Sequence, residues 1–477
     1  MIRRLALPVG PLLLLLAVVA PAPAAMGEPA WRVAGVAGWM ALWWLTAVIP
    51  LEATALIPLV ALPLLAVGPL SDVAVHYADP VIFLFLGGFL IAAALERWNL
   101  HRRFAAATVR VVGRERRRVI LAFLLATAFL SMWISNTATA VMMLPIAVAT
   151  AGLEPGGSVA DLGPERGFGV ALLLAVAYGA SIGGVTTLIG SPPNAIFAGM
   201  ARELAGAEVT FASWLPVGLA LALPMLAVCW VALVTLFRVP RGPAALSPAM
   251  TEAPATRLGG GERVVIGVFV LAAAAWVLRT PKELGALRVP GLTDLLPGLT
   301  DAGIAVGAAL LLFAVPLPRG RHRFALDWET ARHVPWGVLL LFGGGLALAG
   351  AFETSGLTTW IGAQLVALRG LPAPLVIGAT ATMFVFLTEL TSNTATAALG
   401  MPLMAGVAEG VGMPPFQLML AAALSASMAF MLPVATPPNA IVFGARLLRI
   451  GDMARAGIVL NFVAIVAITM VVSLFAG

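Results

Sequence analysis

The dominant pattern along the chain is a series of long apolar stretches separated by short segments that carry most of the charged residues. A run of about 20 apolar residues is long enough to cross a bilayer as a helix, whereas the strands of a membrane barrel alternate and lack such runs. The pattern therefore predicts an all-α polytopic membrane protein. We predict about 11 transmembrane helices, at residues 6–24, 33–49, 51–68, 80–96, 170–199, 211–237, 264–278, 302–317, 335–352, 412–445 and 456–476.

Two further apolar stretches, 119–153 and 370–408, differ because each carries polar residues at its centre. The sequence Ser-Asn-Thr stands there in both, beginning at Ser135 and at Ser392. These residue types disfavour helix interiors and favour turns and helix caps. We predict two re-entrant helical hairpins with these residues at their tips, near the bilayer centre. An ordinary cluster of interhelical hydrogen bonds is the alternative.

The basic residues predict the orientation of the chain, because cytoplasmic loops carry an excess of Lys and Arg. With a cytoplasmic N-terminus, all but six of the 28 Lys and Arg residues lie on the cytoplasmic side. This arrangement requires the hairpin at 119–153 to enter from the cytoplasm and the hairpin at 370–408 to enter from outside. We expect residues 1–29 to be a retained first helix, although the small residues around Pro23 also resemble a signal-peptidase site.

Composition narrows the class of protein further. Hydrophobic residues make up 61% of the 477 residues and charged residues 10%, which excludes a water-soluble enzyme, a disordered protein and a coiled coil. The single cysteine, Cys229, excludes a disulfide framework, and the four histidines are not spaced as metal ligands within an apolar run. Arginines in cytoplasmic loops account for the net charge of +6, so we expect no nucleic-acid partner.

The chain contains an internal repeat. Ser-Asn-Thr-Ala-Thr-Ala occurs at 135–140 and at 392–397, and Pro-Pro-Asn-Ala-Ile follows at 192–196 and at 437–441. Five predicted crossings separate the hairpins, so the repeats have opposite orientations, which is typical of secondary transporters with sites near the midplane. The predicted parts are a first helix, a first inverted repeat, a cytoplasmic linker and a second inverted repeat, at 1–29, 30–240, 241–262 and 263–477.

Each Pro-Pro pair is predicted to break a transmembrane helix, one at 170–199 and the other at 412–445. Proline removes a donor and clashes with the carbonyl four residues back, which would free carbonyls near Leu188 and Pro433. Unwound backbone at membrane depth persists where it lines a cavity or is buried in protein. Freed carbonyls suit Na⁺, and the N-termini of half-helices suit an anion. A plain kink is the alternative.

The hairpins and broken helices contain no Arg or Lys, and Glu389 is their single acidic residue. A dianion would therefore be held by hydrogen bonds, helix dipoles and bound cations, which is a physical reason for coupling to Na⁺. The lack of a chain of buried acids and histidines argues against a proton relay. We expect Glu389 to be a hydrogen-bonded structural acid rather than a titrating group. The spans offer no nucleophile–base pair or metal cluster, so we expect no enzyme.

The paired Ser-Asn-Thr and Pro-Pro-Asn-Ala motifs resemble those of the divalent anion/sodium symporter (DASS) family, over nearly the whole chain from about residue 30. Its members carry succinate-type dicarboxylates, citrate or sulfate. The resemblance implies an inverted-repeat fold with two re-entrant hairpins, a homodimer, and an elevator motion of a transport domain against a scaffold domain. It also implies co-transported Na⁺, two ions or more, and no organic cofactor.

The resemblance further implies which residues bind the ions and the substrate. The predicted sodium-binding residues, through side chains or carbonyl oxygens, are Ser131, Ser135, Asn136, Gly190, Thr388, Thr391, Asn393 and Ala435. The predicted substrate-binding residues are Asn136, Thr137, Ser191, Pro192, Asn393, Thr394, Thr436 and Pro437. Ser191 departs from the family pattern, which often has Thr, so the hydroxyl is kept and a methyl is lost.

The function expected from these observations is Na⁺-coupled symport of a dicarboxylate of the succinate, malate or fumarate type across the inner or plasma membrane. A dicarboxylate exchanger or an inorganic oxyanion carrier on the same fold is the first alternative. A membrane-embedded enzyme or structural protein is the second.

Overall fold

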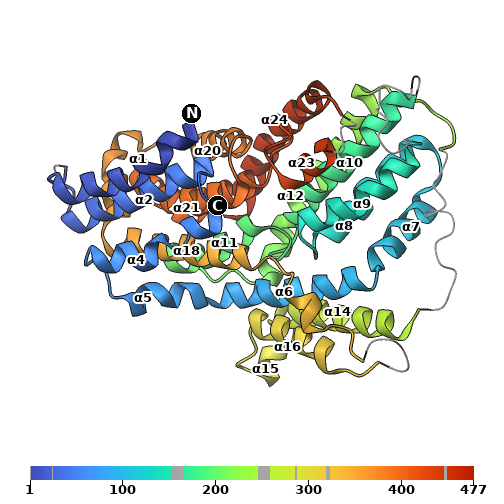
Figure 1. The fold of residues 1–477 in the computed structure, drawn as a ribbon, viewed down its shortest axis with the longest axis horizontal. Coiled ribbons are helices and arrows are strands. Elements are labelled where there is room, and N and C mark those ends of the chain that lie inside the picture. The colour runs from blue at the N-terminus through green and yellow to red at the C-terminus, as the bar shows by residue number, and fades with distance from the viewer. Residues whose placement is uncertain are drawn as a thin grey trace.

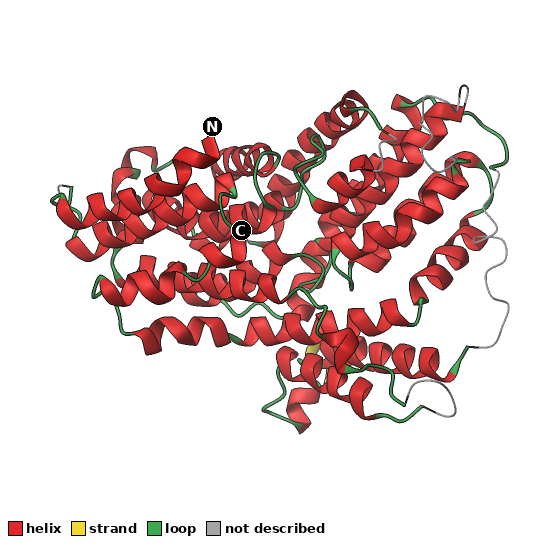
Figure 2. Cartoon of the chain, in the orientation of Figure 1, coloured by secondary structure: helices red, strands yellow, loops and turns green. Residues whose placement is uncertain are grey.

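The computed structural model describes residues 2–23, 25–152, 163, 165–244, 258–284, 287–317, 323–444 and 448–476. Most of the predicted linker at 241–262, and the last residue of the span predicted at 412–445, lie outside the described residues. The described chain is almost entirely helical (Figure 1), as the apolar pattern predicts. Figure 2 shows the exception, a two-stranded antiparallel sheet of β1 (Lys282–Leu284) and β2 (Leu287–Val289).

The helices of the first half begin near the N-terminus and end at residue 236. They are α1 (Ile2–Val19), α2 (Glu28–Thr46), α3 (Leu51–Thr54), α4 (Ile57–Leu64), α5 (Leu70–Val75), η1 (His76–Ala78), α6 (Pro80–Arg97), α7 (Leu100–Val112), α8 (Arg116–Ser131), α9 (Asn136–Thr150), α10 (Arg166–Gly184), α11 (Pro192–Ala205) and α12 (Phe211–Leu236).

The helices of the second half begin at residue 260. They are α14 (Gly260–Leu278), α15 (Leu292–Leu295), α16 (Asp301–Ala314), α17 (Trp328–Ala331), α18 (Trp336–Thr354), α19 (Leu357–Gln364), η3 (Val366–Leu368), α20 (Ala373–Thr388), α21 (Asn393–Val411), α22 (Pro415–Ala426), α23 (Pro437–Gly444) and α24 (Ile450–Phe475).

Each Ser-Asn-Thr sequence lies at the break between two consecutive helices. α8 ends at Ser131 and α9 begins at Asn136, while α20 ends at Thr388 and α21 begins at Asn393. Ser135 is the N-cap of α9, and its hydroxyl accepts a hydrogen bond from the Ala138 backbone N–H at 3.2 Å. A serine at this position satisfies one of the four N–H groups that have no partner within the helix.

The two broken helices correct the expectation about the prolines. Pro192 is the first residue of α11 and Pro437 the first residue of α23, so the prolines begin the second half-helix instead of distorting a helix interior. Proline is well suited to a first turn, where its missing N–H would have no partner within the helix. The unwound backbone therefore precedes the prolines, at 185–191 and at 427–436.

The second half of each broken helix packs against the hairpin of the other repeat. α11 contacts α21 and α22, and α23 contacts α9 and α10. Figure 1 shows α8, α9 and α10 on one side, α20 and α21 on the other, and α11 and α23 between them. Because each half-helix packs against the other repeat, the two unwound segments and the two hairpin tips lie together at the centre of the molecule.

The predicted spans differ in length in the structure. Six described segments are helices long and apolar enough to cross a membrane: Leu70–Arg97, Arg166–Gly184, Phe211–Leu236, Gly260–Leu278, Trp336–Thr354 and Ile450–Phe475. Shorter apolar helices occupy most of the other predicted spans, and the span predicted at 51–68 is divided into α3 and α4. The orientation and the boundaries of the repeats stay predictions.

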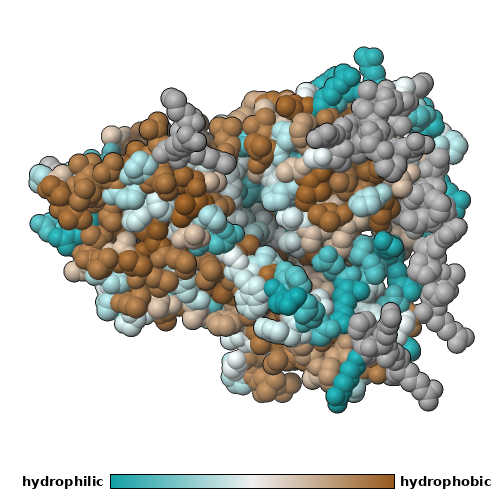
Figure 3. All heavy atoms as spheres, viewed as in Figure 1, coloured by the Kyte–Doolittle hydropathy of each residue, from teal (hydrophilic) through white to brown (hydrophobic). Residues whose placement is uncertain are grey.

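The arginine-rich segment after α6 forms a helix that the apolar pattern does not predict. One face of α7 is buried, including Leu100, Ala105 and Val109, while Arg102 and Arg110 lie on the exposed face. This spacing is typical of an amphipathic helix. Figure 3 shows hydrophilic side chains gathered in the lower right part of that view, near this segment, and hydrophobic side chains over the left part.

Candidate functional site

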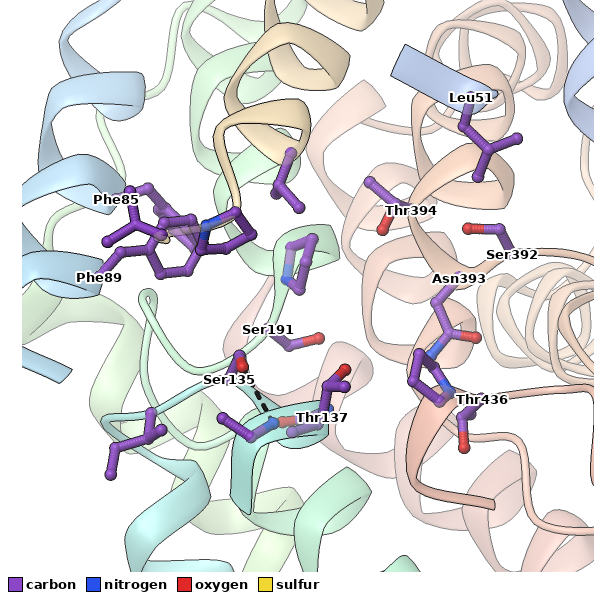
Figure 4. Close-up of a pocket in the computed structure, with 18 of the residues that line it drawn as sticks. Leu51, Phe85, Phe89, Ser135, Thr137, Ser191, Ser392, Asn393, Thr394 and Thr436 are labelled. Carbon is purple, nitrogen blue, oxygen red and sulfur yellow. Dashed lines mark hydrogen bonds between the residues drawn. The ribbon is translucent and has the colours of Figure 1, made fainter. Parts of the chain in front are cut away.

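A cavity with a volume of about 1250 Å³ lies where the two halves meet. Its wall contains both hairpin tips and the starts of α11 and α23. In Figure 4, Ser135, Thr137 and Ser191 face Asn393, Thr394 and Thr436 across the open space. Apolar side chains of α6, including Phe85 and Phe89, form another part of the wall.

The cavity contains most of the residues predicted for sodium and substrate. Ser131 and Thr388 are the exceptions, because both are fully buried behind the wall. The predicted residues that line the cavity are Ser135, Asn136, Thr137, Gly190, Ser191, Pro192, Thr391, Asn393, Thr394, Ala435, Thr436 and Pro437. The roles assigned to all of these residues stay predictions.

Asn136 reaches a group of oxygen atoms behind the first hairpin tip. Ser131 Oγ lies 2.6 Å from Asn136 Oδ1 and 2.8 Å from the Ala180 carbonyl oxygen. With the amide turned over, the Asn136 nitrogen would lie 3.1 Å from the Gly190 carbonyl oxygen and 3.2 Å from that of Ala180. The end of this side chain thus meets three oxygens, and such an excess of oxygen is satisfied either by the amide N–H groups or by a cation.

Glycine is required beside this group. A Cβ atom on Gly184 would lie 2.2 Å from Asn136 Oδ1, and one on Gly190 would lie 2.5 Å from the Gly184 carbonyl oxygen. Both distances are well inside van der Waals contact. The absence of side chains at these two positions is what allows the unwound backbone to approach the hairpin tip so closely.

Asn393 occupies a similar position behind the second tip. Thr388 Oγ1 lies 2.8 Å from Asn393 Oδ1 and 2.8 Å from the Ala426 carbonyl oxygen. Thr391 points elsewhere, because its hydroxyl lies 2.5 Å from the hydroxyl of Thr396. The carbonyls of Ala180 and Ala426 are therefore part of the two oxygen groups, although the motifs alone do not indicate them.

The asparagine of each Pro-Pro-Asn sequence holds the unwound backbone together. The Asn194 amide donates to the carbonyls of Gly184 and Thr187 at 3.0 and 2.7 Å. The Asn439 amide donates to the carbonyl of Leu432 at 3.1 Å and also to that of Ala429. These carbonyls directly precede Leu188 and Pro433 or lie one helical turn before them, and they have a side-chain donor.

Glu389 is buried beside the second hairpin tip and is hydrogen-bonded, as expected. Its Oε1 accepts from the backbone N–H groups of Phe430 and Met431 at 2.7 and 2.8 Å, and from the Asn461 amide at 2.8 Å. Its Oε2 accepts from the Leu432 N–H at 3.0 Å. One carboxylate therefore satisfies three backbone donors of the segment that unwinds between α22 and α23.

One end of the cavity carries acidic and basic residues that the motifs do not indicate. Glu96, Arg97, Glu329 and His333 line it there. Arg97 is paired with Asp327 at 2.6 Å. Burial would raise the pKa of Asp327, but hydrogen bonds from the Thr330 backbone and hydroxyl and from Arg97 outweigh it and lower the pKa to about 2. The pair therefore stays ionised at neutral pH.

Sequence comparison identifies the family. The profile described as the sodium:sulfate symporter transmembrane region matches residues 3–476. The chain belongs to this family. Membership in a symporter family makes the chain a transport protein rather than an enzyme.

Two curated relatives carry the same name. A protein of Staphylococcus saprophyticus named sodium-dependent dicarboxylate transporter SdcS is 40% identical over 97% of this chain and 89% of its own length. A protein of the same name from Staphylococcus aureus strain RF122 is 39% identical over the same shares. The fold also resembles the crystal structure of the Alcanivorax borkumensis YdaH transporter, with a TM-score of 0.57, 16% identity and coverage of 94% of this chain and 98% of that one.

Proposed function

We propose that the protein carries a dicarboxylate of the succinate, malate or fumarate type together with Na⁺ across the cell membrane. The observation that carries the proposal is the central cavity, where two Ser-Asn-Thr tips and two unwound segments present hydroxyl, amide and carbonyl groups. An anion with two carboxylates, one toward each half, would meet donors at both ends. The 40% identity to a protein named sodium-dependent dicarboxylate transporter supports the same cargo.

Sodium fits the two oxygen groups behind the hairpin tips. In each group a hydroxyl oxygen lies 2.6–2.8 Å from an asparagine amide oxygen and 2.8 Å from a backbone carbonyl oxygen. Such neutral oxygens are the ligands that hard cations take. We assign one Na⁺ to the Asn136 group and one to the Asn393 group, so that each ion adds positive charge next to a carboxylate of the substrate.

The test is uptake of radiolabelled succinate into proteoliposomes, with and without an inward Na⁺ gradient. We expect concentrative uptake with the gradient and none when choline replaces Na⁺. Equal uptake in both would contradict sodium symport. Because the family profile is described as sodium:sulfate, unlabelled sulfate is the competitor to include; stronger competition by sulfate than by fumarate would favour an oxyanion carrier.

The orientation and the motion belong to the same proposal. The charged end of the cavity, with Arg97 and Glu329, belongs to segments that the arginine bias places in the cytoplasm, so we infer a cavity open to the cytoplasm. We further propose a homodimer in which the hairpins and broken helices move as an elevator against the other helices.

The topology can be tested on single-cysteine variants because Cys229 is the one natural cysteine and is buried. In a Cys229→Ser background, a cysteine at Asp72 should react with an impermeant thiol reagent in intact cells, and one at Arg117 should not. The reverse labelling pattern would rule out a cytoplasmic N-terminus.

A further inference from the structure

The hydroxyl of Ser191 faces the cavity but has an unusual partner behind it. Ser191 Oγ lies 3.2 Å from the hydroxyl oxygen of Ser427, and each side chain is about 1% exposed. Ser191 lines the cavity, whereas Ser427 does not. Ser427 belongs to the unwound segment of the other half, directly after α22, so this contact joins the two unwound segments at the back of the cavity.

Thr436 is the matching residue of the second half, and its hydroxyl has a different kind of partner. Its Oγ1 accepts a hydrogen bond from the backbone N–H of Asn439 at 3.2 Å, which leaves its own proton free. Ser191 is the N-cap of α11, yet its side chain makes no hydrogen bond to that helix. Among the described residues, Ser427 is the partner found for its hydroxyl.

We propose that Ser427 is a positioning residue for the substrate: its hydroxyl donates to Ser191 Oγ, so that the Ser191 proton points into the cavity toward a carboxylate. A hydroxyl has one proton and two lone pairs, so the direction of the Ser191–Ser427 bond decides what the cavity meets. If Ser191 donated to Ser427, the cavity would face lone pairs, which repel an anion. This inference rests on the proposed transport of a dicarboxylate.

The test is the succinate dependence of uptake at saturating Na⁺ for Ser427→Ala. Loss of one neutral hydrogen bond that orients a donor should raise the KM for succinate about three- to tenfold. The maximal rate and the half-saturating Na⁺ concentration should change little. In the Ser191→Ala/Ser427→Ala double variant, the KM should equal that of Ser191→Ala alone, because Ser427 acts through Ser191.

Two variants separate this role from a general effect on folding. Ser425 is also fully buried on α22, and its hydroxyl has no hydrogen-bond partner among the described residues, so Ser425→Ala should keep the wild-type KM. Ser427→Cys keeps nearly the same volume with a weak donor and should give an intermediate KM; it also serves if Ser427→Ala does not fold.

The outcomes are distinct. An unchanged or lower KM in Ser427→Ala, or in Ser427→Cys if the alanine variant does not fold, would overturn this inference while sodium-dependent uptake by the wild type still stands. A wild type without sodium-dependent succinate uptake would overturn the proposed function and this inference with it. Equal rises in KM for Ser425→Ala and Ser427→Ala would also overturn it, because they would indicate a general disturbance of α22.

Discussion

Behind the first hairpin tip, Ser131 contacts Asn136 and a backbone carbonyl; behind the second, Thr388 contacts Asn393 and a backbone carbonyl in the same way. The neighbouring positions differ. Met132 stands in the first half where Glu389 stands in the second, and the first half has its close backbone approach at Gly184.

A third difference concerns the hydroxyl that follows each tip. Thr396 pairs with Thr391 in the second half, but the corresponding Thr139 has no partner among the described residues, because Ile134 stands opposite. The duplicated motifs thus preserve the groups that would contact cargo and the asparagine that holds each unwound segment, while the two halves differ in what else supports that segment. The first depends on glycine and close approach, and the second depends on a buried carboxylate.

The largest expected effect tests what the halves share. Asn136→Ala and Asn393→Ala should each abolish concentrative succinate uptake, because in the proposed site each removes a ligand of Na⁺ and substrate together. Losing a charge-assisted hydrogen bond costs ~1.5–3 kcal/mol, about tenfold or more in affinity. Uptake and Na⁺ dependence measured in proteoliposomes would check this. If both variants kept near-wild-type uptake and Na⁺ dependence, the assignment of Asn136 and Asn393 to the binding site would be wrong.

Gly184→Ala should affect the first half alone. The added Cβ would lie 2.2 Å from Asn136 Oδ1 and 2.9 Å from its Cγ, so the Asn136 side chain must move. Overpacking of this kind costs about 1–3 kcal/mol, and we expect the half-saturating Na⁺ concentration to rise roughly tenfold. The control is Gly267→Ala on α14, where a Cβ would meet nothing within 4 Å. A similar rise in the half-saturating Na⁺ concentration of Gly184→Ala and Gly267→Ala would contradict the idea that the added Cβ acts by displacing Asn136.

Glu389→Gln should affect the second half alone, and less strongly. The substitution keeps the shape but brings an NH₂ group against backbone N–H donors at 430–432. A buried donor left without an acceptor costs about 1–3 kcal/mol, so the melting temperature in detergent should fall by several degrees. Glu409→Gln on the exposed face of α21 is the matched control. Equal melting temperatures for Glu389→Gln and wild type would show that this carboxylate is dispensable.

The smallest effect concerns the amphipathic helix α7, which precedes the first hairpin and has a buried histidine. Burial, with a smaller contribution from Arg102, lowers the pKa of His101 to about 4. Between pH 6.5 and pH 4 the unfolded chain therefore binds more protons at this residue, and stability falls as the pH is lowered through this window. The helix α19, which lies before the second hairpin in the sequence, contains no titratable side chain.

Melting temperature as a function of pH would measure this effect. The decline between pH 6.5 and pH 4.5 should be shallower in His101→Gln than in wild type, and His333→Gln, at an exposed histidine, should follow the wild type. Parallel curves for all three proteins would show that His101 does not contribute.

The apolar pattern, the repeat and the motif residues could all be found in the sequence, because membrane helices require long apolar runs and because a duplicated polar sequence inside such a run is costly unless it has a role. The pattern also indicated that the helices break near the prolines. It did not show that the prolines begin the second half-helices, because a proline's effect depends on whether it stands in a helix interior or in a first turn.

Contacts between distant segments were decided by the tertiary structure. No local pattern shows that Glu389 would cap backbone donors about 40 residues further along, that Ser191 would meet Ser427, or that α11 would pack on the hairpin of the other repeat. The carbonyls of Ala180 and Ala426 could not be predicted from the sequence either, because every residue has a carbonyl and only the tertiary structure shows which ones meet the motif side chains. The sequence by itself determined which side chains could bind an ion or an anion; the packing of one repeat into the other decided which of them share a cavity and which neighbours their hydroxyl and amide groups meet.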